Sequence, residues 1–212
     1  MASPRPRHWR EIGAPNASLK GPRRYGPFKR AFRRHMAFVY GTVGTDEENA
    51  WARDKARLDA ETFWYRGNGA VDVVPDTEVT DEMAATRNVI LYGNADTNAA
   101  WDRLLPDSPV RAYRGGFTVG DRELVGDDLA GLFLRPMPGT DDGLVGVVAG
   151  SGVIGMRLTD RMPYFVSGVA YADVTILGPD TLLTGPDGVR VGGFFGEDWG
   201  VETGEFVWGS AD

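Results

Sequence analysis

Three glycines between residues 150 and 155 have a spacing that could bring a phosphate group close to the backbone. Gly150, Gly152 and Gly155 form the pattern G-x-G-x-x-G directly after the apolar run 144–149, which predicts a buried strand. In dinucleotide-binding turns, this pattern lets backbone N–H groups at a helix start face a pyrophosphate. Asp173 lies near the distance expected for an acid that binds the ribose. Nucleotide binding is one hypothesis for this segment, and a turn with a purely structural role is the alternative.

Ser151, inside the same pattern, is a candidate catalytic nucleophile. Its neighbours do not give the G-x-S-x-G sequence of a nucleophile elbow. The two histidines, His8 and His35, both precede it, contrary to the chain order of hydrolase triads. A hydrolase that uses Ser151 would therefore need an unusual base such as Asp160. The chain has no cysteine, which excludes thiolate catalysis and disulfide bonds.

Two further turns are expected beside the glycine turn, at residues 41–45 and 93–98. Carboxyl ends of neighbouring parallel strands meet at one edge of a sheet, and helix N-termini attract anions, so we expect a small anionic ligand at this edge. Asp127-Asp128 and Asp141-Asp142 are adjacent pairs typical of solvated turns, and neither a metal nor a cofactor is predicted. The candidate ligand-binding residues are Gly41, Thr42, Gly44, Thr45, Asn94, Thr97, Asn98, Gly150, Ser151, Gly152 and Arg157.

Strands and helices alternate along the chain from residue 36 onward. Thr45 and Glu48 form a capping box that begins a helix over residues 46–67. We expect this helix to pack on a sheet through Ala52, Ala56, Ala60, Phe63 and Trp64. Further strands are expected at 36–41, 71–76, 88–93 and 144–149, with short helices near 81–87 and 97–104.

This alternation predicts the α/β class, with a three-layer αβα, Rossmann-like open sheet that is mostly parallel. An antiparallel excursion is expected around residues 109–136, where short segments are punctuated by glycine. A C-terminal hairpin is expected over residues 181–195, with its turn at Gly185-Pro186-Asp187-Gly188.

Charge divides the chain into a basic arm and an acidic body. Residues 1–35 contain ten Lys or Arg against one acid, although the whole chain has a net charge of −7. We expect this proline-rich arm to dock on, or extend from, a single α/β domain at 36–200, and we expect an acidic tail at 201–212. Docking would use Trp9, Tyr25 and Phe28 as anchors. The alternative for the arm, contact with nucleic acid or anionic lipid, is disfavoured by the acidic body, which would repel phosphates.

No run of the sequence approaches the roughly 18 apolar residues that a membrane helix needs, and the basic residues near the N-terminus are not followed by the apolar stretch typical of a secretory signal. We therefore expect no membrane contact and a cytoplasmic location. Three aromatic residues near the C-terminus could form an exposed interface or pack back on the body: Trp199, Phe206 and Trp208.

Several segments together resemble one known family over about residues 21–199. They are GPFKRAF, MAFVYGT, FWYRGNG, PDTEVT, NVILYGNADTN, LRPMPG, GLVGVVAGSG, MRLTDRMPYFVSGVAYADVTILGP and GVRVGGFFGEDW. This succession is similar to the C-terminal Rossmann-like domain of bacterial prolyl-oligopeptidase-like α/β-hydrolase proteins.

The resemblance implies an association with hydrolases rather than catalysis by this chain. The family's catalytic serine and its partners belong to an upstream hydrolase portion, which this sequence does not contain. We therefore expect a non-catalytic accessory or binding domain whose partner is a separately encoded α/β-hydrolase. The alternatives are a serine hydrolase or peptidase in its own right, and a nucleotide- or anion-binding module.

Overall fold

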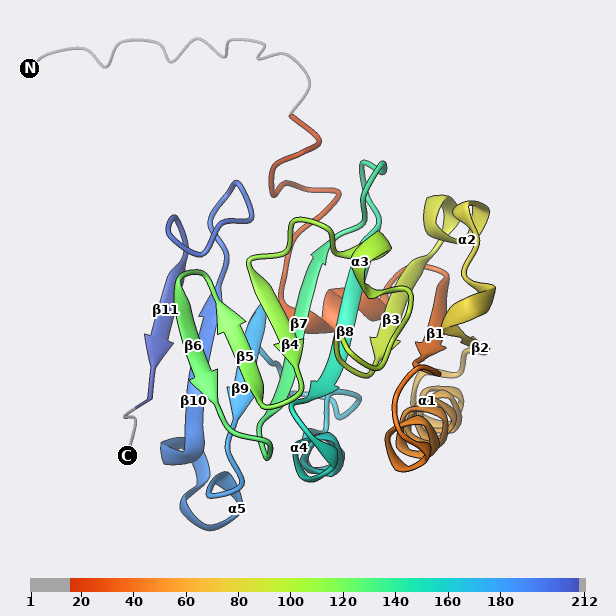
Figure 1. Cartoon of the computed structure of the whole chain (residues 1–212). Helices are drawn as coiled ribbons and strands as arrows, with labels where there is room; N and C mark the ends of the chain where they lie inside the picture. Colours follow the sequence, from red (N-terminus) through yellow and green to blue (C-terminus); the bar gives the residue numbers. More distant parts are fainter. Residues whose placement is uncertain (1–15, 210–212) are drawn as a thin grey trace, which may run out of the picture.

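The computed structural model describes residues 16–209, which form a mixed α/β fold around one eight-stranded sheet (Figure 1). The sheet has the order β11 (Glu205–Trp208), β10 (Val189–Phe194), β9 (Val174–Leu177), β7 (Ala130–Pro136), β8 (Leu144–Gly150), β3 (Asn88–Tyr92), β1 (Met36–Tyr40) and β2 (Asp72–Pro75). The α-helices are α1 (Asp46–Gly67), α2 (Asp81–Thr86), α3 (Trp101–Leu104), α4 (Val153–Leu158) and α5 (Thr181–Thr184). None of the helices in residues 16–209 combines the length and the apolar character that crossing a membrane requires.

The sheet is parallel in one half and antiparallel in the other. β8, β3, β1 and β2 pair in parallel, as the alternation of strands and helices predicts. β7 is antiparallel to both β8 and β9, and β10 is antiparallel to β9 and β11. Strands β3 and β8 are buried along their whole length, which explains their continuous apolar sequences.

One face of the sheet is covered by α1, α4 and the short 3₁₀ helix η1 (Phe28–Phe32) (Figure 1). Gly146 of β8 leaves room for η1, because a Cβ atom there would lie 3.0 Å from the side chain of Ala31. Phe28 is fully buried beside it, and burying a side chain of this size stabilises the fold by roughly 1.5–3 kcal/mol.

The other face carries a three-stranded antiparallel sheet of β4 (Val110–Tyr113), β5 (Gly116–Val119) and β6 (Arg122–Val125), together with α3 (Figure 1). Phe117 of β5 packs on Gly131 of β7, where a Cβ atom would lie 2.4 Å from the ring. The antiparallel excursion expected around 109–136 is therefore present. Its strands cover the face on which a third, helical layer was expected.

The C-terminal hairpin differs from the predicted one. Residues 181–188 form α5 and the 3₁₀ helix η4 (Gly185–Gly188) instead of a strand and its turn. The hairpin consists of β10 and β11, so residues 205–208 join the large sheet as its edge strand. The Gly-Pro-Asp-Gly segment forms a 3₁₀ turn within the longer connection between the antiparallel strands β9 and β10.

The aromatic residues agree with the predictions only in part. Trp64 was placed on the buried face of α1 with Phe63, but it is 66% exposed, whereas Phe63 packs against the core. Of the two alternatives for Trp199, an exposed interface and packing back on the body, the structure shows the second, since Trp199 is buried against Phe195. Phe206 and Trp208 are half-buried on β11.

Residues 16–35 lie along the body of the protein. Phe28 is one of the expected anchors and is buried, whereas Tyr25 is partly exposed and stacks with Arg30. Trp9 lies outside the described residues. Lys20 pairs with the buried carboxylate of Asp173, and its charge also faces the ring of Trp199.

Candidate functional site

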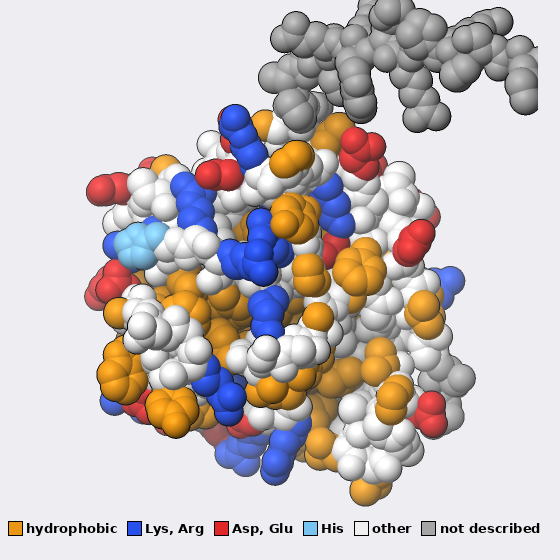
Figure 2. Space-filling model, turned by 180° about the vertical axis from the view of Figure 1, so that it is seen from behind, with side chains coloured by type: hydrophobic (Ala, Val, Ile, Leu, Met, Phe, Trp, Pro, Cys, Tyr) orange, Lys and Arg blue, Asp and Glu red, His pale blue; other side chains and the backbone are white. Residues whose placement is uncertain are grey.

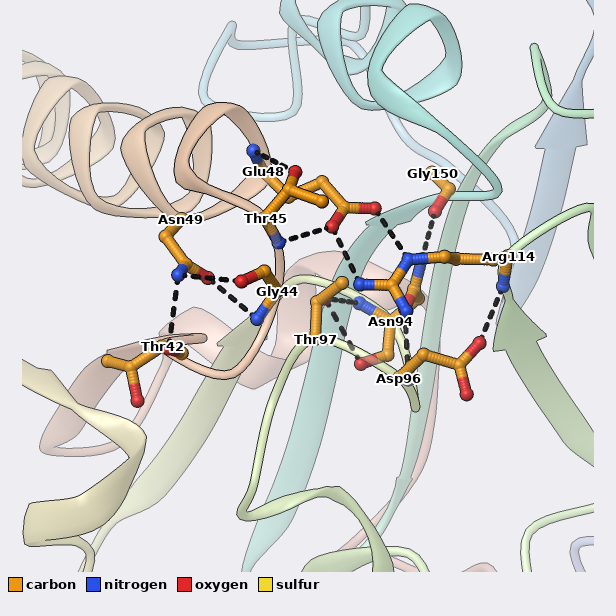
Figure 3. Close-up of polar contacts among 10 residues, drawn as sticks. All are labelled: Thr42, Gly44, Thr45, Glu48, Asn49, Asn94, Asp96, Thr97, Arg114 and Gly150. Atoms are coloured by element: carbon orange, nitrogen blue, oxygen red, sulfur yellow. Dashed lines mark hydrogen bonds and ion pairs between the residues drawn. The ribbon is translucent and has the colours of Figure 1, made fainter.

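The three turns expected to form a ligand site lie next to one another at the carboxyl ends of β1, β3 and β8 (Figure 3). Direct hydrogen bonds join them. The amide of Asn94 donates to the carbonyl of Gly150 at 2.9 Å, and the backbone N–H of Val43 donates to the carbonyl of Thr97 at 3.2 Å. The parallel order of these strands therefore positions the candidate residues as expected.

The turn at 41–45 is closed by side chains from two other elements. Asn49 of α1 donates to the carbonyls of Thr42 and Gly44, both at 3.0 Å, and accepts from the N–H of Gly44 at 2.9 Å. Asp76 accepts from the N–H and the hydroxyl of Thr42 at 3.1 and 2.6 Å, and from the N–H of Ala99 at 2.6 Å. The polar groups of this turn that could bind a ligand thus already have partners within the chain.

The turn at 93–98 is likewise satisfied internally, and its three candidate side chains are at most 1% exposed. The hydroxyl of Thr97 accepts from the N–H of Asn94 at 2.8 Å and donates to its carbonyl. The amide of Asn98 donates to the carbonyls of Val39 and Tyr92, which links the ends of β1 and β3. These residues cap and connect strands, and none of them presents a polar group to solvent.

The ion pair between Glu48 and Arg114 lies beside the turn at 41–45. Glu48 completes the predicted capping box, since its carboxylate accepts from the N–H of Thr45 at 2.8 Å. The guanidinium of Arg114 binds both oxygens of this carboxylate, at 2.9 and 2.8 Å, and the backbone N–H of Arg114 donates to Asp96 (Figure 3). These hydrogen bonds, led by those from Arg114, lower the pKa of Glu48. The capping box was readable from the sequence, but nothing local indicated Arg114, which is 66 positions away.

Electrostatics at this edge disfavour an anion. The carboxylates of Glu48, Asp76 and Asp96 surround the turns, and Arg114 is already paired with Glu48. Arg157, the cation expected to hold the ligand, is exposed and pairs with Glu47 at 2.8 Å. It therefore does not point a free charge at the three turns.

The glycines of the G-x-G-x-x-G pattern make close backbone contacts within the protein. A Cβ atom at Gly150 would lie 2.0 Å from the amide nitrogen of Met156, and one at Gly152 would lie 2.4 Å from the carbonyl oxygen of Asp127. At Gly155, a Cβ atom would lie 2.0 Å from the carbonyl oxygen of Leu129. The loop before β7 thus occupies the space beside these glycines that a pyrophosphate would need.

Asp173 and the following helix also fail to match a dinucleotide site. β9 runs parallel to β8, so Asp173, just before β9, lies toward the opposite edge of the sheet from Gly150. There it accepts hydrogen bonds from Lys20 and from the N–H of Phe195. Helix α4 has only six residues, which gives it a short dipole.

Ser151 has the environment of a structural residue. It is 1% exposed, its hydroxyl accepts from the N–H of Leu129 at 3.0 Å, and it donates to the carbonyl of Leu129 at 3.4 Å. No hydrogen bond joins it to Asp160, which instead lies 3.5 Å from Lys55. The arrangement brings together no nucleophile and base among the described residues.

A buried polar network lies beneath α1, and the sequence analysis did not identify it. Asp59 is 3% exposed and accepts hydrogen bonds from Lys55 at 3.0 Å, from the hydroxyl of Tyr92 at 2.9 Å, and from the hydroxyl of Tyr164. Burial raises the pKa of Asp59, although the positive charge of Lys55 opposes this effect. Burial also raises the pKa of both tyrosines well above their usual value.

This network could have been found from its spacing. Residues 52, 55, 56 and 59 follow the i, i+3, i+4, i+7 rule for one helix face, and all four are buried. The prediction placed only apolar residues on that face. The hydrogen bonds of this network connect α1 to β3 and to the segment that follows α4. All of its polar side chains have partners, so none is free to bind a ligand.

A comparison with protein-family models gives no match for this sequence, and a comparison with curated proteins gives none either. Within residues 16–209, no three acidic or histidine side chains gather as a metal site would require.

Proposed function

We propose that this chain is a non-catalytic accessory domain that binds a separately encoded α/β-hydrolase, in keeping with its resemblance to the Rossmann-like C-terminal domain of prolyl-oligopeptidase-like proteins. The observation that carries the proposal is the state of Ser151. The only residue singled out as a nucleophile is buried, and both hydrogen bonds of its hydroxyl go to the backbone of Leu129. With no exposed nucleophile at the strand ends, we assign the chain a binding role through another surface.

The parallel half of the sheet supports the Rossmann-like relationship. β8, β3, β1 and β2 pair in parallel, with α1 joining β1 to β2. If the chain is related to Rossmann-like domains, the turns at the carboxyl ends of these strands retain the arrangement of a ligand site. Their own side chains occupy the place where a ligand would bind.

A basic face supplies the surface that a binding domain needs. Figure 2 shows Lys and Arg side chains running along the side of the molecule that η1 covers. The side chains of Arg23 and Arg33 make no hydrogen bond or ion pair with any described residue, and both residues are exposed. We call the surface of residues 23–34 the basic face; it contains Arg23, Lys29, Arg30, Arg33 and Arg34. Three of these cations have partners within the chain, since Lys29 donates to the carbonyls of Val166 and Val169, Arg30 stacks on Tyr25 and Arg34 pairs with Asp142. Arg23 and Arg33 therefore supply the charge that would attract an acidic surface on a partner protein.

Exposed aromatic residues add to this surface. Trp64 and Tyr65, near the end of α1, are 66% and 82% exposed, and α1 covers the same face of the sheet as η1. Tryptophan, tyrosine and arginine are the residues that most often dominate the binding energy of protein interfaces. We therefore assign the partner to this side of the molecule.

The test is affinity capture from the native source with the tagged full-length chain, followed by identification of the captured proteins. We expect a protein with an α/β-hydrolase sequence, and we expect the double substitution Arg23→Glu and Arg33→Glu to release it. Arg111→Glu, on the opposite face in β4, is the matched control and should retain the partner.

Capture of other proteins without a hydrolase would contradict the proposal. So would retention of the hydrolase by the double variant together with binding of duplex DNA by the wild-type chain, because the basic face would then serve nucleic acid.

A further inference from the structure

Residues 17–24, 104–108 and 135–141 converge at the end of the molecule opposite α4 (Figure 1). Residues of these three segments line a cavity of about 410 Å³. It is within the size range of small-molecule sites. Its lining includes two arginines, Arg24 and Arg135, and an apolar wall. The wall is made of Leu104, Leu105, Pro106, Pro136 and Met137.

Arg24 is a buried cation without a carboxylate partner. It is 5% exposed, and its guanidinium donates to the carbonyls of Thr140 at 2.7 Å, Ala17 at 2.6 Å and Met137 at 3.5 Å. Its Nε is buried and has no hydrogen-bond partner in residues 16–209. Carbonyl oxygens fix its orientation, but they do not neutralise its charge.

Arg135 is the second cation that lines this cavity. Its guanidinium donates to the carbonyl of Trp199 and lies 4.8 Å from the ring centre of Phe195. No carboxylate of the described chain lies within ion-pair distance of either guanidinium. Burial lowers the pKa of Arg135 to about 10; the charge of Asp198 opposes this shift, and the charge of Arg24 adds to it. Two cations near each other, neither in a direct ion pair, would be stabilised by an anion between them.

The charges at the rim select among anions. Asp107 and Asp141 also line the cavity and are exposed, so the four formal charges of the lining sum to zero. A phosphate dianion would be repelled by these two acids, whereas a single carboxylate suits the fork of a guanidinium. The apolar wall favours a hydrocarbon body attached to that carboxylate.

We propose that this cavity binds a small carboxylate with an apolar body, held by Arg135 and Arg24. The proposal does not depend on the hydrolase partner. Its occupancy would also hold residues 17–24 against the loop at 135–141, since both segments contribute to the lining.

Isothermal titration of the full-length protein with hexanoate tests the proposal, with hexanamide and inorganic phosphate as matched probes. We expect hexanoate to bind with a dissociation constant in the millimolar range or tighter, and hexanamide and phosphate to bind at least about tenfold more weakly. In ¹⁵N-resolved spectra, the Nε–H signal of Arg135 should shift on addition of hexanoate.

Variants assign the binding to this cavity. Arg135→Met should weaken hexanoate binding about tenfold or more, because it removes a charge-assisted hydrogen bond. Arg24→Met could disturb the fold through its three carbonyl contacts, so Asp107→Asn serves as the second variant. Asp107→Asn removes a repulsive charge and should tighten binding several-fold, while Asp121→Asn, an exposed acid of the β5–β6 turn, should not change it.

No binding of hexanoate at about 10 mM would overturn the proposal. Equal binding of hexanoate and hexanamide would overturn the role of the arginines. Stronger binding of phosphate, or an equal effect of Asp107→Asn and Asp121→Asn, would overturn the assigned class of ligand.

Discussion

The guanidinium of Arg114 holds both carboxylate oxygens of Glu48, and through them it joins the small antiparallel sheet to the first turn of α1 (Figure 3). Glu48 also completes the capping box with Thr45. One buried carboxylate therefore stabilises the start of α1 and also binds the turn between β4 and β5. The pair thus links the small sheet to α1 at the edge where a ligand was expected.

Glu48→Gln should lower the free energy of unfolding by about 1–3 kcal/mol, because it removes a charge-assisted pair and weakens the capping box. Urea denaturation followed by circular dichroism measures this change. Glu47→Gln is the control, since Glu47 is exposed and pairs only with Arg157, and it should change stability by less than about 0.5 kcal/mol. Equal effects of the two substitutions would contradict the role given to Glu48.

The same carboxylate predicts a dependence on acid pH. The folded pKa of Glu48 lies below its ordinary value of 4.5, so its contribution to stability is complete above that value and is lost as the pH falls through the folded pKa. The free energy of unfolding should therefore decline below pH 4.5 less steeply in Glu48→Gln than in the wild type. Parallel curves for the two proteins would contradict this prediction.

Asp59→Ala should be among the most damaging single substitutions. It leaves Lys55 and the hydroxyls of Tyr92 and Tyr164 buried without their acceptor, at a cost of about 3–5 kcal/mol. Thermal denaturation gives the measurement, and Asp54→Ala, an exposed acid on the same helix, provides the control. The double variant Lys55→Met with Asp59→Leu should recover part of the loss, because no buried charge then remains unpaired. A mild effect of Asp59→Ala would show that water reaches the network.

Gly155→Ala should lower the free energy of unfolding by about 1–3 kcal/mol or prevent folding, because its Cβ atom would lie 2.0 Å from the carbonyl oxygen of Leu129. Gly192→Ala, where the nearest atom would be 3.9 Å away, should be close to neutral. The same packing predicts that NAD or ATP at millimolar concentration does not raise the melting temperature of the wild type. Stabilisation by either nucleotide that Gly155→Ala abolishes would restore the dinucleotide interpretation.

Ser151→Ala should cost about 1–2 kcal/mol, since the buried N–H of Leu129 loses its acceptor. A fluorophosphonate probe should not label the wild-type chain, because the hydroxyl is inaccessible and has no base. Chemical denaturation and intact-mass spectrometry check the two parts. Ser18→Ala, at an exposed position in a loop near the N-terminus, should leave stability unchanged.

Local signals in the sequence predicted most of the elements, and contacts between distant segments explain what was missed. The capping box of Thr45 and Glu48 follows from a spacing of three residues, whereas the contact with Arg114 depends on how the small sheet folds back. The Gly185–Gly188 segment fits either a hairpin turn or a 3₁₀ turn, and pairing of β10 with both β9 and β11 decides between them.

The candidate site, too, could be predicted from the sequence only in part. The order of β1, β3 and β8 brought the three predicted turns together, because parallel strands place their carboxyl ends at one edge. The sequence could not reveal that Asn49 and Asp76 satisfy the polar groups of the turn at 41–45. Arg24 and Arg135 are 111 positions apart, and only the folded chain places them in one cavity.

The central claim is that this chain binds a hydrolase and does not itself catalyse, and fluorophosphonate labelling of the captured complex tests it most directly. The account predicts that the probe labels a separate α/β-hydrolase polypeptide, that the label is lost from the capture when Arg23 and Arg33 are both replaced by Glu, and that this chain stays unlabelled. Labelling of Ser151 in this chain, with no labelled partner, would contradict the account.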